Sequence, residues 1–206
     1  MKKRLAALML AVTMVFTAVG CGGSAQKDYS FGTVTEQGFE SSFLGYVFET
    51  PEGVTLSTRE EIAKISGVTA DVMKDDLNKF QLEAMQNKTV YDMMATCDNS
   101  LANVNVVITF GNTKGAKMDD VVAANIQQLE SMTAMDVTVD RNTTEVTVAG
   151  KKYTKLSATN VIQGMELKQD MYIYIGDGYM SSITVTYDAD SVADGEALLA
   201  AFKEKK

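Results

Sequence analysis

The chain has 206 residues, enough for one globular domain and a tail, and its apolar fraction of 46% is typical of a folded protein. The formal charge of -8 argues against binding to nucleic acid or to anionic lipid, because like charges repel. The chain contains no histidine, and this argues against zinc enzymes and against hydrolases that depend on histidine for proton transfer.

Residues 1–20 have the pattern of a secretory signal peptide. Lys2, Lys3 and Arg4 precede an apolar run from Leu5 to Val19, and small residues follow it. The run is shorter than the apolar stretch that a transmembrane helix needs. Removal of this segment would leave 16 basic and 27 acidic residues, so the mature chain would carry a formal charge of -11.

The segment Ala18-Val19-Gly20-Cys21 resembles the lipobox of bacterial lipoproteins, in which the cysteine is lipidated and becomes the new N-terminus. Ala18 stands where that motif usually has leucine. The resemblance implies two acyl chains on Cys21, which is the number that stable anchoring takes. It predicts a protein held by Cys21 at the outer face of the cytoplasmic membrane. The alternative is an ordinary secreted protein in which Cys21 has no such role.

Residues 21–42 are expected to comprise the lipidated cysteine and a flexible tether. Glycine, serine and polar residues predominate there, with no sustained hydrophobic period. Phe31 and Phe39 are the exceptions, since aromatic rings in a tether favour docking on the domain. The domain itself is predicted to extend from Phe43 to the end, residues 43–206.

The first half of the predicted domain begins with two short strands on either side of Pro51-Glu52-Gly53. Thr58 and Glu61 have the spacing of a capping box, in which each side chain accepts a hydrogen bond from the other residue's amide. This box predicts a short helix that ends at Gly67. A second helix is expected over 70–87, with an apolar stripe that covers a sheet.

The second half is predicted to be mostly β-structure. Strands are expected at 90–96, 104–111, 135–139, 145–148 and 153–161, with a helix over 118–132 and a last helix from about Asp194 with a lysine-rich end.

Residues 165–187 predict a β-hairpin around Gly176-Asp177-Gly178, because glycine and aspartate tolerate the backbone angles of a tight loop. A three-residue loop puts Ile173 and Ile183 on one face and Tyr172 and Tyr174 on the other. A two-residue loop would mix apolar and polar residues on both faces, so the three-residue loop is preferred. The face with Tyr172 and Tyr174 could be an open groove or a surface covered by a helix, and the sequence pattern is compatible with both.

The order of elements predicts a single α+β domain with a largely antiparallel β-sheet flanked by α-helices. The aromatic strand leading into Pro51-Glu52-Gly53-Val54, the tyrosine-rich hairpin and the lipobox together resemble the PsbP/Mog1-like domain of small Gram-positive envelope lipoproteins. Val54 stands where an aromatic residue is usual in that family. The resemblance covers 43–206 and implies an accessory or binding role without catalysis, as in the photosystem extrinsic subunits that share the fold.

Two acidic clusters are candidates for chemistry. Asp188, Asp190, Asp194 and Glu196 offer the oxygen ligands that calcium prefers, but Val192 and Ala193 occupy positions that an EF-hand loop fills with a ligand and a glycine. A loop that caps the last helix is therefore preferred. Asp71, Asp75 and Asp76 lie together on the predicted second helix, where a solvated face is preferred to an acid and base pair.

Cysteine and methionine are two further candidates for chemistry. Cys97 is the only thiol left once Cys21 is acylated, so no intramolecular disulfide is available, and no histidine can activate it as a nucleophile. Methionine thioethers could bind copper(I). Most of the domain's methionines fall on apolar sides of predicted elements, where packing explains them. They are Met85, Met93, Met94, Met132, Met135, Met165, Met171 and Met180.

The sequence thus predicts a lipid-anchored extracytoplasmic accessory or binding protein with no catalytic residue, metal or cofactor. Its partner would be another envelope protein or a small ligand, with Tyr172 and Tyr174 as candidates to line the site. The alternative is a carboxylate-based cell-envelope enzyme, and a third reading is a structural spacer. An enzyme needs two carboxylates that converge, whereas a binding module needs an apolar or aromatic surface without them.

Overall fold

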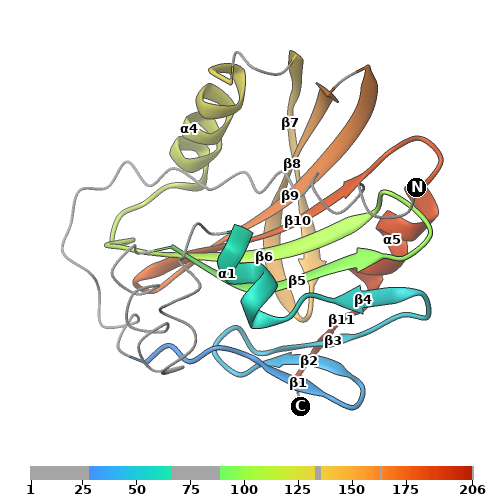
Figure 1. Ribbon diagram of the computed structural model, residues 1–206. Helices are drawn as coiled ribbons and strands as arrows, with labels where there is room; N and C mark the ends of the chain where they lie inside the picture. Colours follow the sequence, from blue (N-terminus) through green and yellow to red (C-terminus); the bar gives the residue numbers. More distant parts are fainter. Residues whose placement is uncertain (1–27, 66–88, 133–135, 163, 206) are drawn as a thin grey trace.

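The computed structural model describes residues 28–65, 89–132, 136–162 and 164–205. The strands are β1 Thr33–Thr35, β2 Gly38–Ser41, β3 Tyr46–Glu49, β4 Val54–Leu56, β5 Thr89–Cys97, β6 Asn103–Phe110, β7 Asp136–Val148, β8 Lys151–Ile162, β9 Met165–Gly176, β10 Tyr179–Tyr187 and β11 Phe202–Glu204. The helices are α1 Arg59–Ile65, α4 Met118–Glu130 and α5 Val192–Ala200 (Figure 1).

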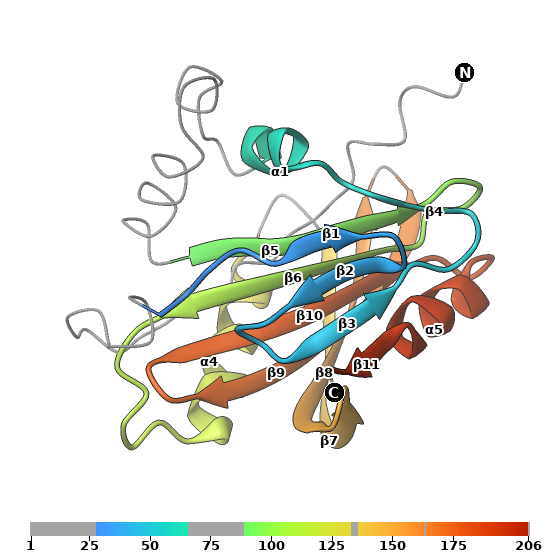
Figure 2. The same cartoon turned by 90° about the horizontal axis from the view of Figure 1, so that it is seen from below.

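The strands form two antiparallel sheets. The large sheet has the order β4-β5-β6-β10-β9-β8-β7, and the small sheet has the order β1-β2-β3-β11. The small sheet lies across one face of the large sheet, with α5 beside it, and α4 lies on the opposite face (Figure 2). The predicted α+β class with largely antiparallel pairing is confirmed. The difference is that a second sheet, and not only helices, covers the large sheet.

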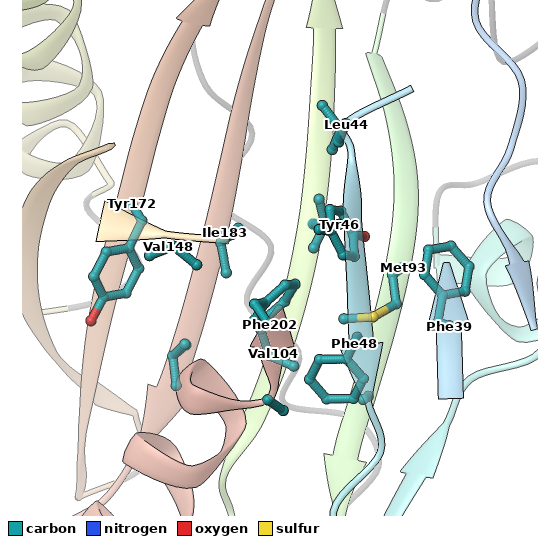
Figure 3. Close-up of a cluster of buried hydrophobic side chains, with 14 of the residues drawn as sticks. Phe39, Leu44, Tyr46, Phe48, Met93, Val104, Val148, Tyr172, Ile183 and Phe202 are labelled. Carbon is teal, nitrogen blue, oxygen red and sulfur yellow. The ribbon is translucent and has the colours of Figure 1, made fainter. Parts of the chain in front are cut away.

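Each face of the large sheet has its own core. Between the sheets, Phe202 packs its ring 5.1 Å from that of Tyr46 and 5.0 Å from that of Phe48 (Figure 3). On the other face, Ile126 and Leu129 of α4 pack against a cluster that includes Ile173. Since β6 and β10 are buried on both faces, the centre of the large sheet is the interior layer of the domain, whereas the edge strand β7 is mostly exposed.

The hairpin of β9 and β10 has a two-residue loop, so the predicted three-residue loop is wrong. Gly176 pairs with Tyr179, which leaves Asp177 and Gly178 as the loop, and Gly178 adopts a φ of 76°. Tyr172 consequently lies beside Ile183, and both faces of the hairpin mix apolar and polar residues. This mixture is tolerated because both faces are interior, so neither has to be wholly apolar while the other meets water.

Residues 28–42, predicted as part of the tether, pack on the domain. Tyr29 and Phe39 are buried, and β2 pairs along β3. These aromatic rings supply apolar area that a period search over such short strands does not detect. Cys21 and the rest of residues 1–27 lie outside the described residues, as does the helix predicted over 70–87.

The predictions for the capping box, the strands beside Pro51 and the last helix have different outcomes. The capping box is confirmed: the Thr58 amide donates to Glu61 Oε2 at 2.8 Å, and the Glu61 amide donates to Thr58 Oγ1 at 3.3 Å. The strands on either side of Pro51 belong to different sheets and do not pair. The last helix begins earlier than Asp194, and the residues after it form β11 instead of a lysine-rich helix end.

Candidate functional site

One end of the domain gathers aromatic rings from segments that are far apart in the sequence. The described chain begins there, and the loop between β2 and β3 and the hairpin of β9 and β10 lie at the same end, at the left of Figures 1 and 2. Centroids of neighbouring rings lie 4.8 to 6.2 Å apart. We call this set the aromatic row; in contact order it comprises Phe31, Tyr29, Phe43, Tyr179, Tyr174 and Tyr153.

The aromatic row is partly accessible. Tyr29 and Tyr153 are buried, whereas Phe31, Phe43, Tyr174 and Tyr179 are half-buried. Burial raises the pKa of Tyr179 to about 12, so its hydroxyl stays protonated and neutral at physiological pH. The row therefore offers ring faces and neutral hydroxyls, which suit contact with an amphipathic or apolar partner.

Hydrogen bonds in the loops hold the row in place. The Thr113 hydroxyl donates to the Gly176 carbonyl at 2.7 Å and accepts from the Gly178 amide at 2.9 Å, which ties the hairpin loop to the end of β6. In the loop between β2 and β3, the Gly45 amide donates to the Ser41 carbonyl at 2.8 Å. Leu44 is buried in this tight loop while Phe43 stays half-exposed.

Two lysines flank the same loop. Lys151 Nζ donates to the Leu44 carbonyl at 2.6 Å and lies 5.3 Å from the centre of the Tyr174 ring. Burial lowers the pKa of Lys151. Lys205 Nζ donates to Ser42 Oγ at 2.8 Å and forms an ion pair with Glu40 at 2.5 Å. The border of the aromatic row thus carries Lys151 and an ion-paired Lys205.

Asp92 is fully buried at a β-bulge of β5 and anchors the start of the described chain. Its carboxylate accepts hydrogen bonds from the Tyr29 hydroxyl at 2.9 Å, the Tyr46 hydroxyl at 3.3 Å and the Gly32 amide at 3.2 Å. Arg59 donates to the Gly32 carbonyl at 2.9 Å and to the Asp92 carbonyl at 2.7 Å. Sequence reasoning missed this group, whose only signal is one acidic residue within an apolar strand. Its role is to fix residues 29–32 on the domain.

Asp170 is the second buried carboxylate, and donors of the fold surround it too. The Ser157 hydroxyl donates to it at 2.6 Å and the Tyr187 hydroxyl at 2.9 Å, and Lys155 Nζ lies 2.9 Å away. Among the described residues, neither Asp92 nor Asp170 is hydrogen-bonded to a second carboxyl group. The pair of converging carboxylates that the enzyme alternative requires is therefore not found at these two positions.

The acidic residues singled out in the sequence have different positions. Asp188 accepts a short hydrogen bond from Ser191 Oγ in the turn before α5. Ser191 is the N-cap residue of α5 but makes no side-chain capping hydrogen bond, which differs from the expected capping loop. No three possible metal-binding carboxylates or thiols come together within the part of the chain that the structure describes. Asp71, Asp75 and Asp76 lie outside that part.

Cys97 is a half-buried free thiol at the end of β5. Burial and the nearby Asp194 carboxylate raise its pKa, which is opposite to the change that activates a nucleophile. Met93, Met94, Met171 and Met180 are buried, in keeping with a packing role, whereas Met165 is 39% exposed. Met85 and Met135 lie outside the described residues.

Tyr172 and Tyr174, which the sequence places on one face of the hairpin, differ in their exposure. Tyr172 is buried in the core cluster beside Val148 and Ile183, so it does not line an open groove (Figure 3). Tyr174, at the border of this core, is half-buried and belongs to the aromatic row.

Among the helices that the structure describes, none is long and apolar enough to cross a bilayer.

No protein-family profile matches the chain, and no curated protein resembles it significantly in sequence. Solved structures with a similar arrangement include a Pseudomonas aeruginosa protein of unknown function, with 16% identity over 46% of this chain and a TM-score of 0.37. This chain spans just under two thirds of that protein, 65%.

Two further neighbours cover more of the chain. Cyanobacterial PsbP (CyanoP) from Synechocystis matches 80% of this chain and 89% of its own, with 12% identity and a TM-score of 0.49. LpqN, involved in cell envelope biogenesis of Mycobacterium tuberculosis, matches 75% of this chain and 79% of its own, with 9% identity and a TM-score of 0.39.

Proposed function

We propose that this protein is an exported accessory lipoprotein, anchored to the outer face of the cytoplasmic membrane by lipid on Cys21, that acts by binding and not by catalysis. The observation that carries the proposal is the aromatic row, the half-exposed cluster of rings at the end where the described chain begins. Rings with neutral hydroxyls favour contact with a partner or ligand, since tyrosine is enriched at binding surfaces.

The chemistry of the acidic residues supports a binding role. Asp92 and Asp170 each accept hydrogen bonds from side chains of the fold itself, so their lone pairs are engaged in holding strands and the N-terminal segment together. A general base requires a carboxylate within reach of a substrate proton. The Cys97 thiol is likewise disfavoured as a nucleophile, because its pKa is raised.

The anchor is tested by replacing Cys21 with serine in the full chain, expressed in a bacterial host that processes lipoproteins. The wild-type chain is expected in the membrane fraction, and Cys21→Ser in the soluble exported fraction, because two acyl chains supply the stable attachment. Incorporation of a clickable palmitate analogue should likewise be lost in Cys21→Ser. Cys97→Ser is the matched control and should keep both the label and the location. A Cys21→Ser chain that stays with the membranes would refute the lipid anchor.

A further inference from the structure

We propose that the aromatic row rests on the surface of the lipid bilayer that holds the anchor, so that the domain lies against the membrane with the end bearing Phe43, Tyr174 and Tyr179 facing the headgroups. This inference rests on the anchor of the proposed function, and it names the partner of the same surface.

The described chain begins at the end of the domain that carries the row. Asp28 is the first described residue, and Tyr29 beside it belongs to the row. The contacts of Asp92 and Arg59 with residues 29–32 fix this segment on the domain. Cys21 precedes Asp28 by seven residues, a length that spans at most about 25 Å when fully extended. An anchor on Cys21 therefore keeps the end of the domain that carries the row close to the headgroups.

The far end of the molecule is held less closely. The hairpin of β8 and β9, with Met165 at its tip, lies at the other end of β9 from Tyr174. Nine residues of extended strand separate the two positions, which amounts to roughly 30 Å. Of the two ends of the large sheet, the tether thus favours the one with the aromatic row.

The side chains of the row suit a boundary between lipid and water. Tyrosine is favoured at the boundary between lipid tails and water, because its ring is apolar and its hydroxyl is polar. Phe31 and Phe43 add apolar rings without charge. Lys151 and Lys205 border the row with their ammonium groups held by the Leu44 carbonyl and by Ser42 and Glu40, and their apolar stems can add to the surface that faces the lipid. These side chains suit contact with the headgroup region, and they do not form a segment that crosses the bilayer.

A weak affinity of the row for lipid is enough to keep it on the bilayer. The chain is acidic, so electrostatic attraction to anionic lipid does not drive the contact. A short tether, however, holds the row near the bilayer at an effective concentration in roughly the millimolar range. A weak intrinsic affinity of the row for the lipid surface is therefore sufficient. A few half-exposed rings can supply such an affinity.

The test attaches the anchor chemically. The chain from Cys21 to Lys206, in a Cys97→Ser background, is coupled through the Cys21 thiol to a maleimide lipid in phosphatidylcholine vesicles. The protein has no tryptophan, so Phe43→Trp introduces a single reporter in the row, and Tyr179→Trp provides a second one if the first variant folds poorly. Met165→Trp, at the exposed far hairpin, is the matched control. Phosphatidylcholine with brominated acyl chains quenches tryptophan that lies at the interface.

We expect brominated lipid to reduce the fluorescence of a reporter in the row to about half, and to leave that of Met165→Trp nearly unchanged, because only the row contacts the bilayer. Equal quenching of both positions, or none at either, would overturn the proposal; a row that stays unquenched would point to a protein partner instead. Because coupling supplies the anchor, this result does not depend on natural acylation, which the Cys21→Ser fractionation tests separately.

Discussion

Ala149 and Gly150 form the two-residue loop between β7 and β8, and both have positive φ angles, 46° and 75°. This loop type matches the twist of the strands but requires left-handed backbone at both positions. Ala149 is the only non-glycine residue with a positive φ in the described part of the chain. An alanine in that conformation carries a steric penalty of about 1–2 kcal/mol.

Replacing Ala149 with glycine should therefore stabilise the domain. Removal of the Cβ relieves the penalty, while the greater freedom of glycine in the unfolded chain offsets part of the gain, so the expected increase in unfolding free energy is about 0.5 kcal/mol. Urea unfolding followed by circular dichroism measures this change.

The neighbouring position provides the matched control. A Cβ on Gly150 would lie 2.8 Å from the carboxyl group of Glu204, and its φ of 75° also disfavours any side chain. Gly150→Ala should thus destabilise by about 1 kcal/mol or more. If both substitutions lowered the urea midpoint by similar amounts, backbone strain at Ala149 would be disproved.

At the scale of elements, the short strand β11 joins the small sheet to its core. Its three residues pair with β3 and complete the small sheet, and Phe202 lies between the rings of Tyr46 and Phe48 (Figure 3). The periodicity of the C-terminal segment instead favours a continued helix. The strand forms because the aromatic side chain at Phe202 gains more by packing between the sheets than the last turn of helix would gain.

Phe202→Ala should destabilise the domain by about 3–5 kcal/mol, because it removes a buried ring and leaves a cavity in the core. Lys203→Ala, one residue further along the same strand at an exposed position, should change the stability by less than about 0.5 kcal/mol. Thermal or urea unfolding of the two variants compares them directly. Equal losses would mean that β11 contributes through its backbone pairing and that the Phe202 ring does not matter.

At the scale of the whole molecule, buried tyrosines make stability depend on pH. Burial raises the pKa of Tyr153 to about 12, and burial together with the Asp92 carboxylate raises the pKa values of Tyr29 and Tyr46. In the unfolded chain these hydroxyls titrate near pH 10, roughly. The stabilising effect of keeping them neutral is therefore fully present below that pH and is lost as the pH rises toward the folded-state values.

The unfolding free energy should accordingly be flat across neutral pH and fall above pH 10, by up to about 1.4 kcal/mol per pH unit for each such tyrosine. Urea unfolding at a series of pH values measures the slope, and absorbance at 295 nm follows ionisation. Tyr153→Phe should reduce the slope by the equivalent of one proton. Ionisation of all tyrosines near pH 10 in the folded protein would contradict the burial of these hydroxyls.

The sequence by itself determined the class of fold and most of its elements. The capping box at Thr58, the strands β5, β6 and β8, helix α4 and the turn at Ala149-Gly150 follow from short-range patterns, because each depends on residues only a few positions apart. The export and lipid signals are local as well, and they stay predictions because Cys21 lies outside the described residues.

Only the tertiary structure decided the register of the β9 and β10 hairpin, the inclusion of residues 28–42 and the formation of β11. Each depends on what covers a strand: the small sheet and α4 bury both faces of the hairpin, so polar residues such as Ser182 are tolerated inside. The aromatic row has the same origin. Phe43 and Tyr179 are 136 positions apart in the sequence, and only the packing of the two sheets brings their rings to 4.8 Å.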